Sequence, residues 1–127
     1  MNRQRFNDLR DKAYTDIVGI NQAKGVDYAG EDDALANFKE AAEALGLTPF
    51  QIWAVYHHKH QSAINQFIKR GRVESEPIEG RVKDAILYLF LLLGLIEDQK
   101  QEAVLDLRHG GVVADRASMS RALGETS

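Results

Sequence analysis

Apolar residues recur at three- and four-residue steps along most of the chain, which is the periodicity of amphipathic helices. The first stripe predicts a helix over residues 2–23, stopped by Gly25. A shorter pattern predicts a second helix over residues 33–45, ended by Gly46. Between them, residues 24–30 form either a plain connection or a backbone nest over a ligand. The apolar positions of the first stripe are Phe6, Leu9, Ala13, Ile17 and Ile20.

The third helix has the clearest local signal in the chain. The run Thr48–Gln51 places threonine at the cap, proline at the first helical position and glutamine three residues after the cap, which is a capping box. The apolar stripe that follows predicts a helix to about Arg70, ended by Gly71. Lys59 falls inside this stripe, where a lysine must extend to solvent or meet an anion.

The most distinctive feature is an apolar run over residues 85–96, interrupted only by Tyr88 and Gly94. It predicts a fourth helix from about Pro77 to residue 101, or as far as residue 107. A helix that is apolar all round is expected at the centre of the fold, wrapped by the other three. The fold class is therefore all-α, with a four-helix core over residues 1–108 and a loosely ordered tail over residues 109–127.

Composition limits the classes of function. The 127 residues fit a single domain, and the net charge of −3 argues against duplex DNA as a direct ligand. The absence of cysteine excludes disulfides and thiolate chemistry. The apolar run is shorter than the roughly 20 residues that a membrane span needs, and no apolar segment follows the basic N-terminus as in a signal peptide. We therefore expect a soluble, cytoplasmic protein that does not bind membranes.

A charged segment, residues 74–84, leads directly into the apolar run. Charges at the edge of a core need partners, a metal or a ligand. Asp84 is the most informative of them, since it begins the buried segment. A structural ion pair with Arg81 or Lys59 and a role in ligand binding are equally good interpretations of Asp84.

Aromatic residues of the third helix suggest a platform. Trp53, Tyr56 and His60 share one face with Lys59 beside them, so they could stack a base and contact its phosphate. Simple core packing is the alternative. His57 and His60 lie one turn apart, but this helix lacks carboxylates at suitable spacing, which favours core-edge histidines over a transition-metal site.

Several blocks occur in an order that resembles a family of small phage and prophage proteins, the nucleotide modification associated domain of type one. The resemblance covers residues 5–97, and members are thought to accompany enzymes that modify bases in phage DNA inside the host cytoplasm. The blocks are Lys24–Tyr28, Ala34–Phe38, Trp53–His60, Glu74–Ile78 and the segment from Arg81 through Asp84 to Leu89. The matching polar positions are Asp27, Tyr28, Asn37, Lys59, His60, Glu76, Arg81 and Asp84.

A looser likeness extends to the all-α nucleotide pyrophosphatases of the MazG and dimeric dUTPase type, which dimerise and hold Mg²⁺ between acidic helices. Asp84 fits the aspartate of their last motif, but Arg81 stands where those enzymes have an acidic residue. Glu40 and Glu43 could replace their first acidic pair. These departures leave open whether the chain is an Mg²⁺-dependent nucleotide phosphohydrolase.

The leading hypothesis is a phage-type protein of nucleotide or base modification that binds a nucleotide between its helices. Lys59 and Arg81 would neutralise phosphate, Tyr28 or Trp53 would stack on the base, and Asn37 would bind a polar edge. The alternative is a non-catalytic helical dimer that acts as an accessory or interaction subunit. The residues assigned to substrate binding are Asp27, Tyr28, Asn37, Trp53, Lys59, His60 and Arg81.

Carboxylates would supply any catalytic chemistry. Glu40, Glu79 and Asp84 are the candidate Mg²⁺ ligands, because Mg²⁺ prefers carboxylates together with substrate phosphates and water. Asp84 and Glu76 are the candidate catalytic groups if hydrolysis occurs. The alternative is that these side chains cap helices or form a solvated face. A homodimer is expected in either case, since three neighbours hardly cover a helix as apolar as the fourth.

Overall fold

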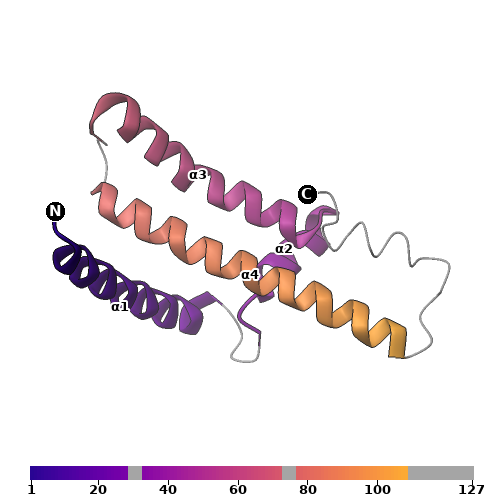
Figure 1. Ribbon diagram of the computed structural model, residues 1–127. Coiled ribbons are helices and arrows are strands. Elements are labelled where there is room, and N and C mark those ends of the chain that lie inside the picture. The colour runs from indigo at the N-terminus through magenta and orange to yellow at the C-terminus, as the bar shows by residue number, and fades with distance from the viewer. Residues whose placement is uncertain (29–32, 73–76, 109–127) are drawn as a thin grey trace. The chain divides into compact units, whose positions relative to one another are not determined.

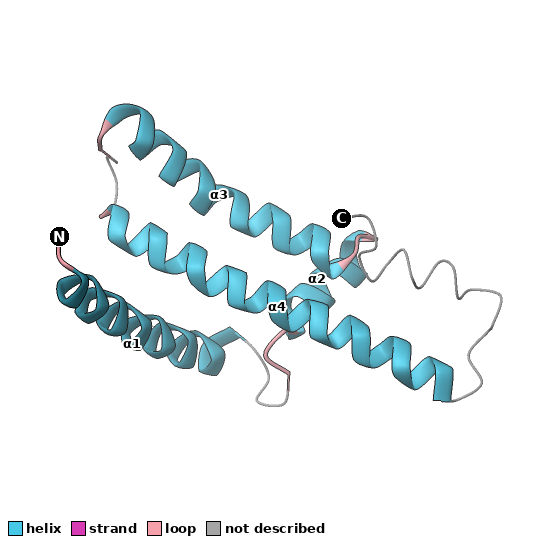
Figure 2. Cartoon of the chain, in the orientation of Figure 1, coloured by secondary structure: helices cyan, strands magenta, loops and turns pink. Residues whose placement is uncertain are grey.

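The computed structural model describes residues 1–28, 33–72 and 77–108, and every regular element in these ranges is an α-helix (Figures 1 and 2). The predicted all-α class with four helices is confirmed. The predicted tail over residues 109–127 lies outside the described residues. In chain order the helices are α1 (Arg3–Tyr28), α2 (Ala36–Leu45), α3 (Pro49–Arg70) and α4 (Ile78–Arg108).

The ends of α3 follow the sequence signals. The Thr48 hydroxyl accepts a hydrogen bond from the Gln51 backbone N–H at 3.2 Å, and the Thr48 backbone N–H donates to Gln51 Oε1 at 2.9 Å. Gly46 and Gly71 both adopt the left-handed conformation, with φ of 68° and 74°. The capping box and the two glycine stops are therefore confirmed, because each depends on chemistry within a few residues.

The first two helices differ from the prediction at their ends. Helix α1 continues through Gly25 to Tyr28, so Lys24–Tyr28 are helical and do not begin a loop or nest. A glycine costs a helix only about 1 kcal/mol, which helix propagation can outweigh. Helix α2 begins at Ala36 and not at Asp33, because the Asp33 carboxylate accepts a hydrogen bond from the Leu35 backbone N–H and holds a turn there.

The chain divides into two compact units, Met1–Leu91 and Leu92–Ser127, and the boundary falls inside α4. In the first unit, α2 and α3 form the most closely packed helix pair, joined by a short turn after Gly46. In the second unit, Leu95 is buried. None of the described helices combines the length and the hydropathy that crossing a membrane requires. The buried apolar side chains of the first unit are Ile17, Leu35, Phe38, Ala42, Ile52, Ala85 and Leu87.

Helix α4 is only partly enclosed, although its sequence predicts burial on all sides. Ala85 and Leu87 are buried, whereas Leu89 and Phe90 remain 49% and 45% exposed. Its neighbours in the first unit thus cover part of its circumference and leave an apolar strip open. The apolar stripe of α1 behaves similarly, since Ile17 is buried while Phe6 is 52% exposed.

Candidate functional site

A buried histidine lies where α3 meets the first half of α4. His60 is 4% exposed, and its Nδ1 atom lies 4.0 Å from Oδ2 of Asp84 on α4. Its ring centroid is 5.0 Å from the ring of Tyr88, one turn after Asp84. We refer to His60, His57, Trp53, Asp84 and Tyr88 as the His60 cluster.

Trp53 ties the cluster together. Its indole N–H donates a hydrogen bond to the backbone carbonyl of Tyr88 at 2.6 Å, which links α3 to α4. Its ring stacks on that of His57, with centroids 4.6 Å apart and planes 12° from parallel. The Trp53 ring thus already has one aromatic neighbour, and its polar atom is already satisfied.

Helix α2 contributes a further aromatic side chain. The ring of Phe38 lies 6.0 Å from that of Tyr56 on α3 and 6.2 Å from that of Tyr88 on α4, the second pair edge to face. Such pairs add about 0.5–1.5 kcal/mol beyond the buried area. The three helices therefore meet around a largely aromatic wall, with the polar groups of the cluster beside it.

Burial lowers the pKa of His60, and the nearby cations Lys59 and Arg81 act in the same direction, while Asp84 opposes them. The imidazole is therefore neutral at pH 7. A neutral His60 does not form a full ion pair with the half-buried carboxylate of Asp84, 4.0 Å away. The cluster thus combines one anionic side chain with two cations in its neighbourhood.

Two ring nitrogens of the cluster lack a hydrogen-bond partner. Nδ1 of His57 and Nδ1 of His60 are both shielded from solvent, and none of the described residues donates to them or accepts from them. A buried polar atom left unsatisfied costs about 1–3 kcal/mol, and such atoms are rare in native proteins. The α3–α4 contact is therefore incompletely satisfied at this point.

Four of the predicted site residues, Trp53, His60, Arg81 and Asp84, come together in this region. Lys59 acts electrostatically on His60, and its own side chain is exposed, as expected for a lysine that extends to solvent from an apolar stripe. The helix turns about 100° per residue, and the inward position is taken by His60.

The other predicted binding residues are not joined to the cluster by any contact described in the structure. Asn37 is half-buried on α2, next to Phe38. Asp27 and Tyr28 occupy the last turn of α1, and their side chains lie outside the described part of the chain. Glu76 also lies outside the described residues. The proposed contacts of Asp27, Tyr28 and Asn37 with a nucleotide and the catalytic role of Glu76 therefore stay predictions.

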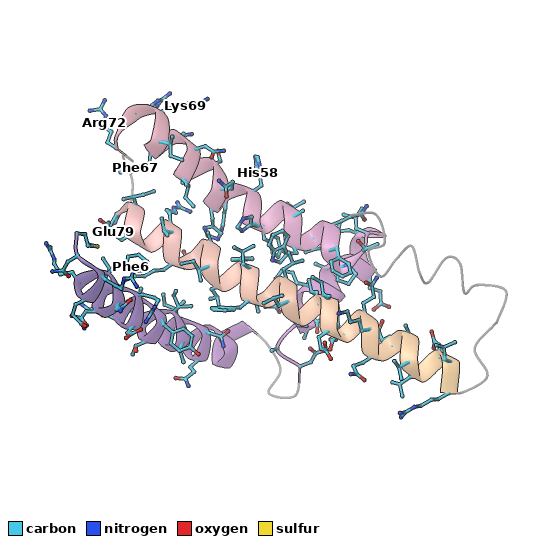
Figure 3. The ribbon with its side chains drawn as sticks, viewed as in Figure 1. Phe6, His58, Phe67, Lys69, Arg72 and Glu79 are labelled. Atoms are coloured by element: carbon cyan, nitrogen blue, oxygen red, sulfur yellow. The ribbon has the colours of Figure 1, made fainter. Side chains whose placement is uncertain are left out.

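The carboxylates predicted as magnesium ligands occupy different environments. Glu40 is exposed on α2, Glu79 is exposed at the start of α4 (Figure 3), and only Asp84 belongs to the cluster. Within residues 1–28, 33–72 and 77–108, no three side chains of the ligating types gather into a group that could hold a metal ion. The magnesium site therefore stays a prediction.

Sequence reasoning missed the role of His57. Its i,i+4 spacing from Trp53 is the signal that could have found the stacked pair, since such positions are neighbours on a helix. His58, by contrast, is exposed and points away from the first half of α4 (Figure 3). No local signal could have found the ion pair of Lys83 with Asp16 on α1, at 2.9 Å.

Comparison with known protein families, characterised proteins and solved structures finds no match for this chain. The resemblance to the phage family therefore stays a prediction. The chemistry of the His60 cluster is the remaining basis for assigning a function.

Proposed function

We propose that the protein binds a nucleotide at the His60 cluster, in the setting of phage nucleotide or base modification. The observation that carries the proposal is the convergence at the His60 cluster of opposite charges and of aromatic rings from α3 and α4. Asp84 lies 4.0 Å from His60, Lys59 and Arg81 both act on it, and Tyr88 packs against it. A nucleotide presents the same combination, an aromatic base joined to anionic phosphates.

The cations suit the phosphate end of such a ligand. Arg81 can offer two parallel N–H donors to a phosphate, and the exposed Lys59 can add a point charge from α3. Salt-dependent attraction by these two groups would bring the ligand to the α3–α4 contact. The neutral His60 would bind through a hydrogen bond and not through charge, which suits a polar edge of the base.

The aromatic residues suit the base end. Trp53 is held in place by its bond to the Tyr88 carbonyl and by stacking on His57. It therefore serves as a rigid wall, and base stacking on an aromatic ring is worth about 1–3 kcal/mol. The unsatisfied Nδ1 atoms of His57 and His60 support entry of a polar group or water into the α3–α4 contact.

The proposal concerns binding and derives no hydrolytic step. Of the three candidate metal ligands, all of which the structure describes, Asp84 alone belongs to the cluster. Any Mg²⁺ would arrive with the nucleotide, held mainly by phosphates and water with Asp84 as a protein ligand. Asp84 and Glu76 remain the candidates for catalytic roles.

Thermal unfolding with nucleoside mono- and triphosphates, each in Mg²⁺ or in EDTA, tests the proposal. A nucleotide present at 100 times its Kd should stabilise the fold by about 2.7 kcal/mol, a rise in Tm of several degrees. If no ordinary or modified nucleotide shifts the Tm in either condition, the proposal is wrong.

Two variants and a control locate the site. Lys59→Gln should weaken binding about tenfold by removing a phosphate contact, equivalent to about 1.4 kcal/mol. Lys69→Gln removes the same charge from the far end of α3 (Figure 3) and should leave binding unchanged. Equal losses in both variants would indicate general electrostatic attraction instead of a site.

The second candidate function is a non-catalytic helical dimer that serves as an accessory or interaction subunit. The exposure of Leu89 and Phe90 favours it. Asp84→Ala separates the two candidates. If Asp84 is a structural partner, its removal should destabilise the fold by about 3–5 kcal/mol. If Asp84 serves a ligand, the variant should keep its stability and lose nucleotide binding.

A further inference from the structure

The facing atoms of His60 and Asp84 have a defined hydrogen-bonding character. Nδ1 of His60 belongs to a side chain that is 4% exposed, and it has no hydrogen-bond partner among the described residues. Oδ2 of Asp84 lies 4.0 Å away, which is too far for a direct hydrogen bond. A third group that bonds to both atoms would therefore satisfy the buried nitrogen.

We propose that these two atoms select nucleotides whose base carries an exocyclic amino group, as cytosine, adenine and guanine do. The inference rests on the proposed nucleotide-binding function and adds the class of base. One N–H of the amino group would donate to Oδ2 of Asp84, and the other would donate to Nδ1 of His60. Uracil and thymine have a carbonyl where cytosine has its amino group, so they would bind more weakly.

The donor and acceptor chemistry of the two side chains favours an amino group. A carboxylate accepts hydrogen bonds and donates none, so a ligand group that bonds to Asp84 must donate. Its two oxygens offer about four acceptor sites, so Asp84 can also keep the contacts that it already makes. A neutral imidazole has one accepting nitrogen, and Nδ1 of His60 can take that role. A primary amino group supplies two N–H donors from one nitrogen, whereas a carbonyl supplies none.

The distance between the two acceptors suits a single bridging nitrogen. A hydrogen bond from an N–H group spans about 2.9 Å, so one nitrogen can reach two acceptors that are 4.0 Å apart. Both hydrogen-bond angles then stay above about 150°, which is the preferred range. Because Nδ1 of His60 is shielded from solvent, the ligand must displace a side chain to reach it, and such rotamer changes are common on binding. The Asp84 side chain is 22% exposed, so the ligand meets Asp84 first.

The same carboxylate is a candidate Mg²⁺ ligand, and the two roles lead to different specificities. If Asp84 binds a metal ion together with phosphates, it acts on a part that all nucleoside triphosphates share and gives no preference among bases. If Asp84 binds the base, it acts where cytosine and uracil differ. Comparing CTP with UTP therefore isolates the proposed contact, since the two ligands have the same sugar and the same phosphates.

Calorimetric titration of the full chain with CTP and with UTP, in the presence and in the absence of Mg²⁺, tests the inference. CTP should bind about tenfold more tightly than UTP or better, because the uracil carbonyl leaves both acceptors without a donor. Asp84→Asn should reduce this preference to about twofold or less, since an amide can donate to the carbonyl as well as accept from the amino group. Asp106→Asn, at an exposed position near the end of α4, is the matched control and should keep the wild-type preference.

Failure of this inference and failure of the proposed function give different results. If CTP and UTP bind the wild type equally well, nucleotide binding stands and the selection of amino-bearing bases is wrong. That comparison needs no variant, so it decides the matter even if Asp84→Asn does not fold. A preference for CTP that persists in a folded Asp84→Asn, as judged by far-UV circular dichroism, would also overturn the inference. If none of CTP, UTP, ATP and GTP binds, the proposed function fails and the inference fails with it.

Discussion

Two faces of α4 share one apolar stretch of sequence and have different surroundings. On one face, Asp84 and Tyr88 meet the buried His60, and Trp53 donates to the Tyr88 carbonyl. On the other face, Leu89 and Phe90 remain about half-exposed. The more polar face is thus the one that the chain covers, and the more apolar face is the one that it leaves open.

The difference shows that hydrophobicity alone does not decide which side of a helix is buried. The polar face is covered because its partners lie on α3 of the same chain, where Trp53 donates to the Tyr88 carbonyl and His60 packs on the Tyr88 ring. The apolar face needs only apolar area, which any matching surface can supply. An exposed apolar face of this kind is a surface that another molecule could cover.

The largest effect on stability should be seen when a buried and an exposed leucine of α4 are each replaced by alanine. Leu87→Ala, at a position 6% exposed, should destabilise the fold by about 2–4 kcal/mol because it leaves a cavity. Leu89→Ala should cost less than about 1 kcal/mol at dilute protein, since Leu89 is 49% exposed. Urea unfolding followed by circular dichroism measures both.

Repeating these unfolding measurements at several protein concentrations makes the first prediction more specific. If Leu89 lies in the contact of the helical dimer that is the second candidate function, the cost of Leu89→Ala should grow as the protein concentration rises, because association then stabilises the wild type more than the variant. The cost of Leu87→Ala should stay nearly constant. Equal costs for the two variants at low concentration would show that the faces do not differ in burial.

A smaller effect is expected from the bond that joins α3 to the polar face of α4. Trp53→Phe keeps an aromatic ring to stack on His57 but loses the indole N–H that donates to Tyr88 at 2.6 Å. The variant should be less stable by about 1 kcal/mol, since the Tyr88 carbonyl lies inside α4 and can still accept the hydrogen bond of the helix. Chemical denaturation monitored by circular dichroism measures the change, and an unchanged midpoint would contradict the role of the bond.

The smallest effect is a dependence of stability on pH that comes from His60. Burial lowers the pKa of this side chain in the folded protein, so below about pH 6.5 the unfolded chain binds more protons than the folded one. Stability should therefore be fully retained above that pH and fall as the solution is acidified toward the folded pKa. Unfolding curves collected between pH 5 and 8 follow this loss.

Two glutamine variants assign the pH dependence to its source. His60→Gln should flatten the profile, since the group whose pKa is lowered is gone. His58→Gln, at an exposed position, should leave the profile as in the wild type. If the pH profile of stability changes in the His58 variant and not in the His60 variant, His60 is not the source of the pH dependence.

Local chemistry predicted the helices and most of their ends. The capping box at Thr48 and the left-handed glycines Gly46 and Gly71 act over a few residues, so the pattern alone locates them. The exceptions are the end of α1 and the start of α2. At Gly25 the cost of a glycine is too small to stop the helix, and at Asp33 a side-chain hydrogen bond forms a turn first.

The candidate site could be predicted only in part. Trp53, His60, Arg81 and Asp84 were found because polar or aromatic residues stand out at the edge of an apolar stretch. The stacking of His57 on Trp53 was missed. From the sequence alone, the direction of the buried face of a helix is uncertain by about one residue, or 100°, because the neighbouring helices that bury it are not known.

By itself, the sequence determined an all-α protein of four helices, with a charged entrance to an apolar fourth helix. Those features follow from periodicity, helix caps and composition, which depend only on residues that are close together in the sequence or on the residue content of the chain. Only the tertiary structure decided that Asp84 faces His60 and that Leu89 and Phe90 face outward. The physical reason is that burial depends on which helices lie beside a residue, and those helices are distant in the chain.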